Sequence, residues 1–173
     1  MDYQTKENWY AVFVATGDED NVKERINYKL KDHLRAVVPK RKMRERKKGI
    51  WEDKIRTLFP GYVLLKGDIS SNTYYCLRSI PGVIRILTDI NGPQQIHKQE
   101  IEIICRLTTY GETIGSSRVY TEGGKIIVMD GPLYGMEGYI QSIDKRKGRV
   151  KVSLNLMNEF RIVELCVSLV QLA

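Results

Sequence analysis

The most constraining feature of the sequence is the stretch at residues 58–65, LFPGYVLL, where an aromatic precedes a Pro-Gly pair and an apolar run follows. Pro60 fixes its own φ and pushes Phe59 into an extended conformation. Gly61 allows a bend or a close approach by another backbone. The apolar run after it is typical of a central strand covered on both faces. Phe59 is therefore either a core aromatic at a strand start or an aromatic at the rim of a pocket that grips a partner.

Length and hydropathy limit the class of protein. The chain has 173 residues, enough for one large domain or two small ones. No apolar run approaches the roughly 20 residues that a membrane-spanning helix needs. The first seven residues are polar and do not make a signal peptide. We therefore expect a cytoplasmic protein that does not enter a membrane.

The residue types that carry metal and catalytic chemistry are sparse. Cys76, Cys105 and Cys166 are widely spaced and are expected to be reduced, mostly buried thiols of a cytosolic protein. His33 and His97 have no neighbouring Cys or paired His, so we expect neither a metal nor a cofactor. The sequence lacks a Ser-His-Asp set, an HExxH motif and a phosphate-cradling GxxxxGK[ST] motif, which argues against an enzyme.

The positive charge is concentrated in one short segment. The net charge is +7, and residues 40–56 hold nine basic and three acidic residues. This concentration favours contact with nucleic acid or another polyanion; the alternative is a solvated, mobile loop. The apolar residues that follow predict that the basic run is the tip of a hairpin. Its basic residues are Lys40, Arg41, Lys42, Arg44, Arg46, Lys47 and Lys48.

Residues 1–109 mix strand and helix patterns. The four-residue spacing of Val22, Ile26, Leu30 and Leu34 predicts a helix that reaches about Leu34. The irregular alternation of elements is typical of an α+β layer with a mainly antiparallel sheet. The expected strands cover residues 8–15, 36–39, 58–66 and 83–87, and two further helices cover residues 70–77 and 97–107.

The apolar periodicity lapses over residues 110–120, where glycine and serine predict a linker. Residues 121–173 are then predicted to be all β. Five short strands over roughly fifty residues are typical of a small barrel. These strands are expected at residues 125–129, 139–143, 149–154, 160–165 and 167–172.

A polar stripe runs along the predicted barrel. A basic turn leads into a strand whose alternate residues Arg149 and Lys151 share one face, and we expect Arg161 to extend that face. Such a stripe can follow phosphates, while nearby asparagines can bond base edges of a structured RNA; the alternative is a solvated barrel edge. The candidate RNA-binding residues are Lys145, Arg146, Lys147, Arg149, Lys151, Asn155, Asn158 and Arg161.

Several motifs occur together in the order and spacing of one family. They are Trp9-Tyr10, FPGYV at residues 59–63, LRSIPGV at 77–83, Gly-Gly-Lys leading to Asp130-Gly131-Pro132, and Val163-Glu164-Leu165. Together they resemble the NusG family of bacterial transcription elongation factors, from about Asn8 to Leu172. The resemblance implies a NusG N-terminal domain over residues 1–109, a linker over 110–120, and a KOW domain, an SH3-like β-barrel, over 121–173.

The resemblance also implies partners. In the family, an aromatic pocket of the N-terminal domain docks on the clamp helices of RNA polymerase, and the bound factor bridges the clamp across the DNA channel. It implies a monomer that performs no covalent chemistry and places its basic hairpin along DNA in the elongation complex. The residues that fall on the docking positions are Trp9, Tyr10, Phe59, Pro60 and Tyr62.

Departures from the family pattern favour a specialised member. Housekeeping members carry an aromatic in the Gly-rich loop that helps the barrel contact termination factor Rho or the ribosome, and this chain has Met136 there. The segment Asn158-Glu159-Phe160-Arg161 replaces a usual glycine-arginine pair. The basic run at residues 40–48 is denser than in a housekeeping member. The opening strand with its short acidic turn is similar to LoaP, an antitermination branch whose KOW domain recognises an RNA hairpin in the nascent transcript. A housekeeping elongation factor and a ribosome-associated KOW protein remain alternatives.

Overall fold

The computed structural model describes residues 7–172. Residues 1–6 and residue 173 lie outside that range. The expectation that the chain has no signal peptide was based on residues 1–7, so nearly all of that segment lies outside the described residues. The chain divides into two compact units. The first unit is Met1–Val38 with Phe59–Ile101, and the second is Pro39–Leu58 with Glu102–Ala173. The basic hairpin thus groups with the carboxyl-terminal strands, while the domain boundaries near residues 109 and 121 stay a prediction.

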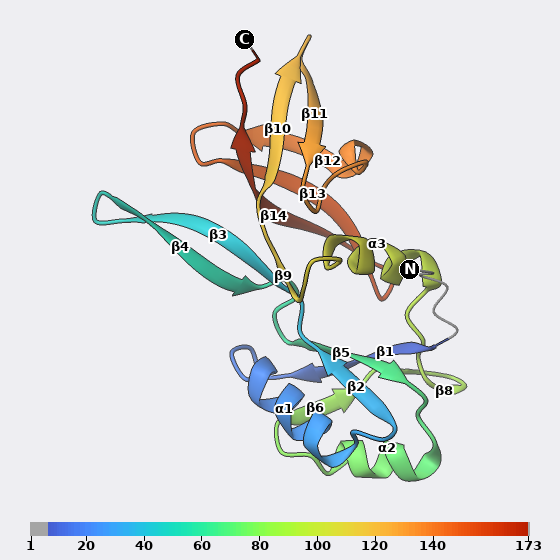
Figure 1. Ribbon diagram of the computed structural model, residues 1–173. Helices are drawn as coiled ribbons and strands as arrows, with labels where there is room; N and C mark the ends of the chain where they lie inside the picture. The colour runs from blue at the N-terminus through green and yellow to red at the C-terminus, as the bar shows by residue number, and fades with distance from the viewer. Residues whose placement is uncertain (1–6, 173) are drawn as a thin grey trace. The chain divides into compact units, whose positions relative to one another are not determined.

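The first unit is a four-stranded sheet with two helices on one face (Figure 1). Its strands lie in the order β2-β5-β1-β6, and every neighbouring pair is antiparallel, as predicted. Its elements are β1 (Trp9–Val14), α1 (Glu19–Lys29), β2 (Leu34–Val37), β5 (Tyr62–Gly67), α2 (Ser71–Arg78), β6 (Val83–Ile86), β7 (Thr88–Asp89) and β8 (Gly92–Pro93). The third helix, α3 (Lys98–Leu107), follows in the chain.

The core of this unit lies between the helices and the sheet. Alternate residues of the two central strands, such as Val12 and Val63, pack with Val22 and Ile26 of α1 and Leu77 of α2. Full burial of an aliphatic side chain of this size contributes roughly 1.5–3 kcal/mol. Alternate side chains of β1 and β5 therefore pack against the helices, and the side chains between them lie on the opposite face of the sheet.

The first helix is shorter than the sequence predicts. It ends at Lys29, and the N–H of Leu30 donates to the carbonyl of Ile26 at 2.8 Å. The chain then turns, and Leu34 begins β2. Leu30 and Leu34 both belong to the same core. The four-residue spacing of apolar residues continues past the end of the helix because Leu34, on strand β2, is buried in the same core as the apolar residues of α1.

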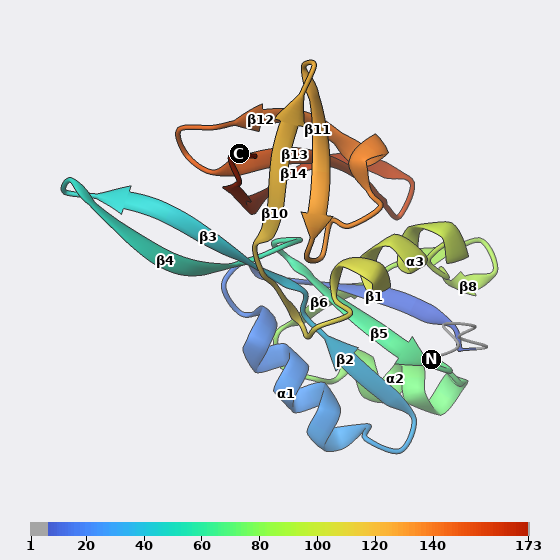
Figure 2. The same cartoon turned by 45° about the horizontal axis from the view of Figure 1, so that its top comes forward.

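The second unit contains the basic hairpin, which is β3 (Lys40–Lys47) and β4 (Ile50–Thr57) (Figures 1 and 2). The basic run is a whole strand rather than the hairpin tip that the sequence predicts. The pairing of Lys47 with Ile50 leaves only Lys48 and Gly49 in the turn, with φ of 50° and 80°. Two-residue hairpin turns favour positive φ at both positions. Because Gly49 readily adopts this conformation, the turn forms after Lys47, and the basic residues before it belong to strand β3.

The rest of the second unit is a five-stranded sheet in the order β11-β10-β14-β13-β12. The pairing of β10 with β14 is parallel and the others are antiparallel. Its core consists of alternate aliphatic residues, including Val150, Val152 and Leu165. The elements are β10 (Ser117–Glu122), β11 (Lys125–Asp130), η1 (Glu137–Tyr139), β12 (Ile140–Asp144), β13 (Arg149–Leu156) and β14 (Glu159–Leu169).

Two sequence expectations for this unit are wrong. The expected linker carries structure, because β9 (Thr113–Ile114) pairs with the start of β3 and β10 begins at Ser117. The last two expected strands are one continuous strand, β14, which pairs with β13 from Glu159 to Cys166 and with β10 from Val167 to Leu169. Because one neighbour takes over where the other ends, the strand continues through the expected break. Met157 and Asn158 form the tight turn between β13 and β14, with φ of 54° and 62°, a conformation that asparagine tolerates better than most residues.

The cysteines are less buried than expected. Cys76, Cys105 and Cys166 are each half-buried. Across residues 7–172 no cluster of His, Cys, Asp and Glu could hold a metal ion. Within the same residues no helix is long and apolar enough to cross a membrane.

Candidate functional site

The Phe59–Tyr62 segment forms a tight turn before the central strand of the first unit. The N–H of Tyr62 donates to the carbonyl of Phe59 at 3.1 Å, and Gly61 has a φ of +85°. A proline followed by a residue with positive φ is the pattern of a type II turn. A Cβ on Gly61 would meet a ring carbon of Phe13 at 3.3 Å. The turn thus needs glycine for its backbone conformation and for the close approach of an aromatic ring.

A buried carboxylate holds this turn in place. Glu19, at the start of α1, accepts the N–H of Gly61 at 2.9 Å through one oxygen and the N–H of Gly17 at 2.8 Å through the other. Its side chain is buried. The sequence analysis missed Glu19, since an acid at a helix start is commonly explained by the helix dipole alone. Here the carboxylate also fixes the Pro-Gly turn to the end of β1.

The register of β1 and β5 places a second set of side chains on the face of the sheet opposite the helices, which we call the aromatic face. Trp9, Ala11 and Leu64 are buried on this face, and Phe13 and Tyr62 are half-buried. Phe13 pairs with Tyr62 across the strands, and their rings meet edge-on with centroids 5.5 Å apart. The ammonium of Lys66 lies 5.9 Å from the ring centre of Trp9. The face consists of Trp9, Ala11, Phe13, Tyr62 and Leu64.

The structure separates the residues predicted to dock on polymerase. Trp9 and Tyr62 lie on the aromatic face, and Pro60 is exposed in the turn beside it. Tyr10 belongs instead to the core on the helix side. Phe59 is only 2 % exposed, which is the burial that the core-aromatic alternative expects. The docking role of these residues stays a prediction.

The acids of the hairpin neutralise only part of its charge. Asp53 lies 3.4 Å from Lys42, and Glu45 forms two hydrogen bonds with Arg56 at 3.0 and 2.8 Å. The hydrogen bonds from Arg56 lower the pKa of Glu45. These ion pairs are exposed and contribute little to stability. They show that Lys42 and Arg56 already have acidic partners within the hairpin.

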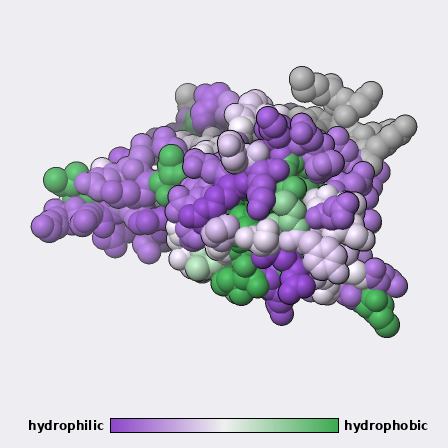
Figure 3. Space-filling model, turned by 90° about the horizontal axis from the view of Figure 1, so that it is seen from below, coloured by the Kyte–Doolittle hydropathy of each residue, from purple (hydrophilic) through white to green (hydrophobic). Residues whose placement is uncertain are grey.

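The remaining hairpin cations gather toward its turn. Arg46, Lys47 and Lys48 are exposed, whereas Lys40, Arg41 and Lys42 are half-buried. Figure 3 shows the hairpin, at the left of the view, as mostly hydrophilic with hydrophobic atoms near its end. The charges most accessible to a phosphate therefore lie in the outer half of β3 and in the turn that follows it.

Two arginines bind the hairpin to the sheet of the same unit. Arg41 donates to the carbonyl of Glu164 at 2.8 Å, and Arg149 donates to the carbonyl of Arg44 at 2.7 Å. Arg149 also pairs with the carboxylate of Glu164 at 3.2 Å. Burial lowers the pKa of the Arg41 guanidinium. Both arginines were predicted to contact nucleic acid. In the structure Arg41 holds β3 to β14, and Arg149 holds β13 to β3.

The predicted RNA-binding stripe is only partly assembled on one face. The register of β13 and β14 places Arg149, Lys151 and Asn155 on the outer face of the sheet. It places Arg161 opposite Leu154, on the other face, so Arg161 does not extend the stripe as predicted. The one-residue alternation of a strand explains the difference. Asn158 supplies the turn conformation, and Lys145, Arg146 and Lys147 form the turn before β13.

Several aromatic residues near these charges were not singled out from the sequence. Trp51 lies on β4 with the guanidinium of Arg44 5.6 Å from its ring centre. Phe160 is 63 % exposed on the outer face, across from Asn155. An aromatic inside a basic run is a signal of nucleic-acid binding that could have marked Trp51.

Comparison with known proteins identifies the family. The family model described as transcription termination factor nusG matches residues 7–105. The chain belongs to the NusG family. It is 29 % identical to the transcription termination/antitermination protein NusG of Rickettsia felis, over 91 % of this chain and 85 % of the relative. It is also 29 % identical to the NusG of Pasteurella multocida, over 93 % of this chain and 92 % of the relative.

A solved structure supports the same fold. The structure described as domain interaction in Thermotoga maritima NusG aligns with a TM-score of 0.61 and 26 % identity, covering 93 % of this chain and 94 % of that one. The predicted α+β class is confirmed, with the first unit corresponding to a NusG N-terminal domain and the carboxyl-terminal strands to a β-rich, KOW-like domain. The chain is thus a NusG-like termination/antitermination factor.

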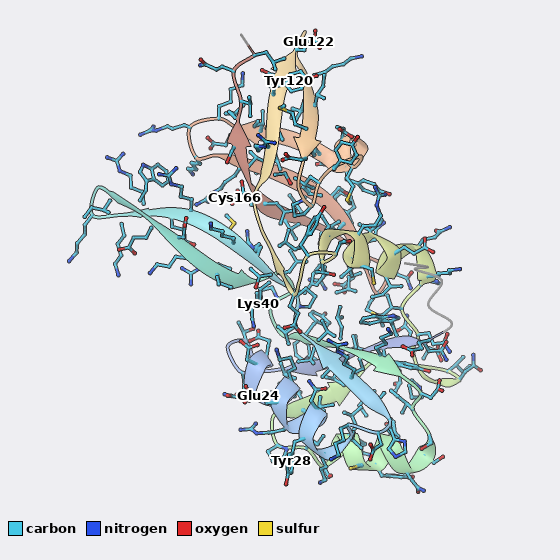
Figure 4. All side chains as sticks on the ribbon, viewed as in Figure 1. Glu24, Tyr28, Lys40, Tyr120, Glu122 and Cys166 are labelled. Carbon is cyan, nitrogen blue, oxygen red and sulfur yellow. The ribbon has the colours of Figure 1, made fainter. Side chains whose placement is uncertain are left out.

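The role of the Glu19 carboxylate in holding the Pro-Gly turn can be tested by removing this carboxylate. Glu19→Ala leaves two backbone donors, those of Gly17 and Gly61, without their acceptor. The donor of Gly61 is buried, and losing its partner costs about 1–3 kcal/mol, whereas Gly17 is exposed and its N–H can bond to water. Urea unfolding should therefore show a loss of about 1–3 kcal/mol. The matched control is Glu24→Ala, an exposed carboxylate on the same helix (Figure 4), which should change stability by less than about 0.5 kcal/mol. An equal loss of stability in the two variants would show that the hydrogen bonds of Glu19 are not needed to hold the turn.

Proposed function

We propose that this chain is a transcription elongation factor that binds RNA polymerase through its first unit and nucleic acid through its second. The observation that carries the proposal is the rigid Pro-Gly turn beside the aromatic face, in a chain of the NusG family. The proposal assigns no covalent chemistry, and it makes the site of action the cytoplasm.

The aromatic face supports the polymerase contact. Its edge-on pair, Phe13 and Tyr62, is half-buried, and Pro60 next to it is exposed. Aromatic side chains that are held rigid by their own fold lose little entropy on binding, and such residues commonly dominate the energy of an interface. We propose that this face docks on the clamp helices of the polymerase, with Tyr62 as the accessible anchor and Trp9 and Phe59 as its support.

The hairpin and the outer face of the sheet support the nucleic-acid contact. Exposed cations at the end of β3 suit phosphates of DNA, a contact that positions a protein without reading sequence. Lys151 and Asn155 lie together on β13 and suit an RNA hairpin opened by a bulge or loop. We propose DNA as the partner of the hairpin and structured RNA as the partner of this face.

The Gly-rich loop bears on whether the factor is general or specialised. Met136 is 1 % exposed, whereas Tyr134, two residues earlier, is 65 % exposed. An exposed aromatic is therefore present in this loop, which supports a general NusG role more than the sequence alone did. The curated relatives bearing the name NusG support the same role. The basic strand β3 favours the second candidate, a LoaP-like antiterminator recruited by an RNA hairpin.

The polymerase contact can be tested at Tyr62. Because this ring is half-buried on the aromatic face, Tyr62→Ser should weaken binding to core RNA polymerase at least about tenfold, measured by biolayer interferometry. Tyr62→Phe keeps the ring and should bind nearly as well as the unaltered chain. Tyr28→Ser changes an exposed tyrosine on α1 and should have no effect. Binding of Tyr62→Ser with unchanged affinity would reject this docking face.

The general and specialised roles can be separated by transcription in vitro. Templates should carry an intrinsic terminator behind either the leader of the factor's own operon or an unrelated leader. A LoaP-like antiterminator should raise read-through only behind its own leader, because recruitment depends on the RNA element. A general factor should change elongation or termination equally on both templates. No effect on either template, with polymerase binding intact, would contradict both candidates.

A further inference from the structure

A basic cleft lies within the second unit, between the hairpin and the carboxyl-terminal strands. It has a volume of about 360 Å³. One side is formed by Arg44 and Trp51 of the hairpin, and the other by the turn that joins β12 to β13 and by the end of β14. The residues that matter to its chemistry are Arg44, Trp51, Lys145, Arg146, Lys147 and Cys166. The cleft brings together Arg44 from the predicted DNA-binding run and the Lys145–Lys147 turn from the predicted RNA-binding stripe, which the contacts proposed above do not join into one site.

The hairpin side of the cleft is flat and aromatic. The Arg44 guanidinium lies 5.6 Å from the centre of the Trp51 ring, within the range of a cation–π contact. Trp51 is half-buried, so part of its ring reaches the surface. A ring paired with a guanidinium is a surface on which a nucleobase of any sequence can stack.

The opposite side of the cleft is strongly positive. Lys145, Arg146 and Lys147 follow one another in a turn whose shape is fixed by the carboxylate of Asp144, which accepts the N–H of Lys147 at 2.9 Å. Gly148 closes this turn with a φ of +64°, and a Cβ there would meet the carbonyl of Val167 at 3.0 Å. The backbone of the turn is thereby held against β14, and its three residues line a space that suits a phosphate. The ammonium of Lys145 also donates to the hydroxyl of Thr121 at 3.4 Å.

The acids near the cleft have other partners. Glu164 pairs with Arg149 at 3.2 Å, and Asp53 lies 3.4 Å from Lys42. The bonds from Arg41 to the carbonyl of Glu164 and from Arg149 to the carbonyl of Arg44 hold the two sides of the cleft together. The space between them is therefore preformed, which reduces the entropy lost when a ligand binds.

We propose that this cleft binds an unpaired nucleotide of a single-stranded nucleic acid, with its base on Trp51 and Arg44 and its phosphate on the Lys145–Lys147 turn. The size suits a small ligand, since such sites start at roughly 300 Å³. The proposal rests on the proposed function in that a nucleic acid must be near the factor, and it adds a site for a single strand. RNA and DNA share this chemistry, so the test includes both.

Binding should be measured on the full chain by fluorescence anisotropy with labelled eight-nucleotide single strands of RNA and DNA. Trp51→Leu removes the stacking surface and should weaken binding about 5- to 150-fold, the range that corresponds to about 1–3 kcal/mol per stacked base. Trp51→Phe keeps an aromatic ring and should recover most of the affinity. Inorganic polyphosphate, which has no base, should bind Trp51→Leu and the unaltered chain equally well.

The cationic side has its own variant and control. Replacing Lys145, Arg146 and Lys147 with glutamine should weaken binding of the oligonucleotides and of polyphosphate, and should reduce the salt slope for a single strand by about two. The control replaces Lys29, Lys31 and Arg35, exposed residues of the first unit, so that the net charge is the same. The control should leave the salt slope unchanged.

Alkylation of Cys166 gives a readout that needs no variant. Cys166 is half-buried and lines the cleft, whereas Cys76 is a half-buried cysteine of α2 (Figure 4 labels Cys166). A saturating eight-nucleotide strand should slow alkylation of Cys166, followed by mass spectrometry, and leave Cys76 unchanged. A blunt-ended duplex of equal charge should protect Cys166 less, because its bases are paired and not free to stack on the protein.

Two results would overturn the proposal. One is a lack of Cys166 protection under saturating single strand. The other is an affinity of folded Trp51→Leu for the single strands equal to that of the unaltered chain. Polymerase binding that depends on Tyr62 would persist in either case, so the failure of the cleft would be distinguishable from the failure of the proposed function. Stronger binding of RNA than of DNA would point to the transcript as the source of the nucleotide, and the reverse to an unpaired DNA strand.

Discussion

The first unit depends on one buried carboxylate. Glu19 joins the start of α1, the turn after β1 and the start of β5 through two backbone hydrogen bonds. β5 lies between β1 and β2, so the point where it starts sets which side chains face the helices. A slip of one residue would exchange the core face and the aromatic face. The proposed docking surface therefore exists only because the Pro-Gly turn is fixed.

In the second unit, two arginine bonds join the hairpin to the sheet: one runs from β3 to β14 and the other from β13 to β3. Glu164 receives Arg41 on its carbonyl and Arg149 on its carboxylate, while Arg149 also reaches the carbonyl of Arg44. Hydrogen bonds from charged donors are stronger than neutral ones. Part of the basic charge is thus structural, while Arg46, Lys47 and Lys48 are exposed near the turn of the hairpin and Arg44 lines the basic cleft.

The sequence predicted the fold class and the elements with strong local signals. Helix α2 is an example: it was expected over residues 70–77 and lies at Ser71–Arg78, where the hydroxyl of Ser70 accepts the N–H of Thr73. Local patterns failed where tertiary contacts decide: Leu34 continued a helical spacing inside a strand, and β14 ran through a position expected to break it. For the candidate site, the composition located the basic segments. Only the strand register shows that Tyr10 and Tyr62 lie on opposite faces of their sheet, and that Arg161 and Lys151 lie on opposite faces of theirs.

The central claim is that the aromatic face meets polymerase while the hairpin meets nucleic acid. It is tested most directly by photo-crosslinking in a halted elongation complex, with a photoreactive phenylalanine analogue in place of Tyr62 in one sample and of Lys48 in another. The account predicts that position 62 crosslinks to a polymerase polypeptide and that position 48 crosslinks to nucleic acid. Crosslinking of position 62 to nucleic acid, or to nothing in a complex that retains the factor, would contradict it.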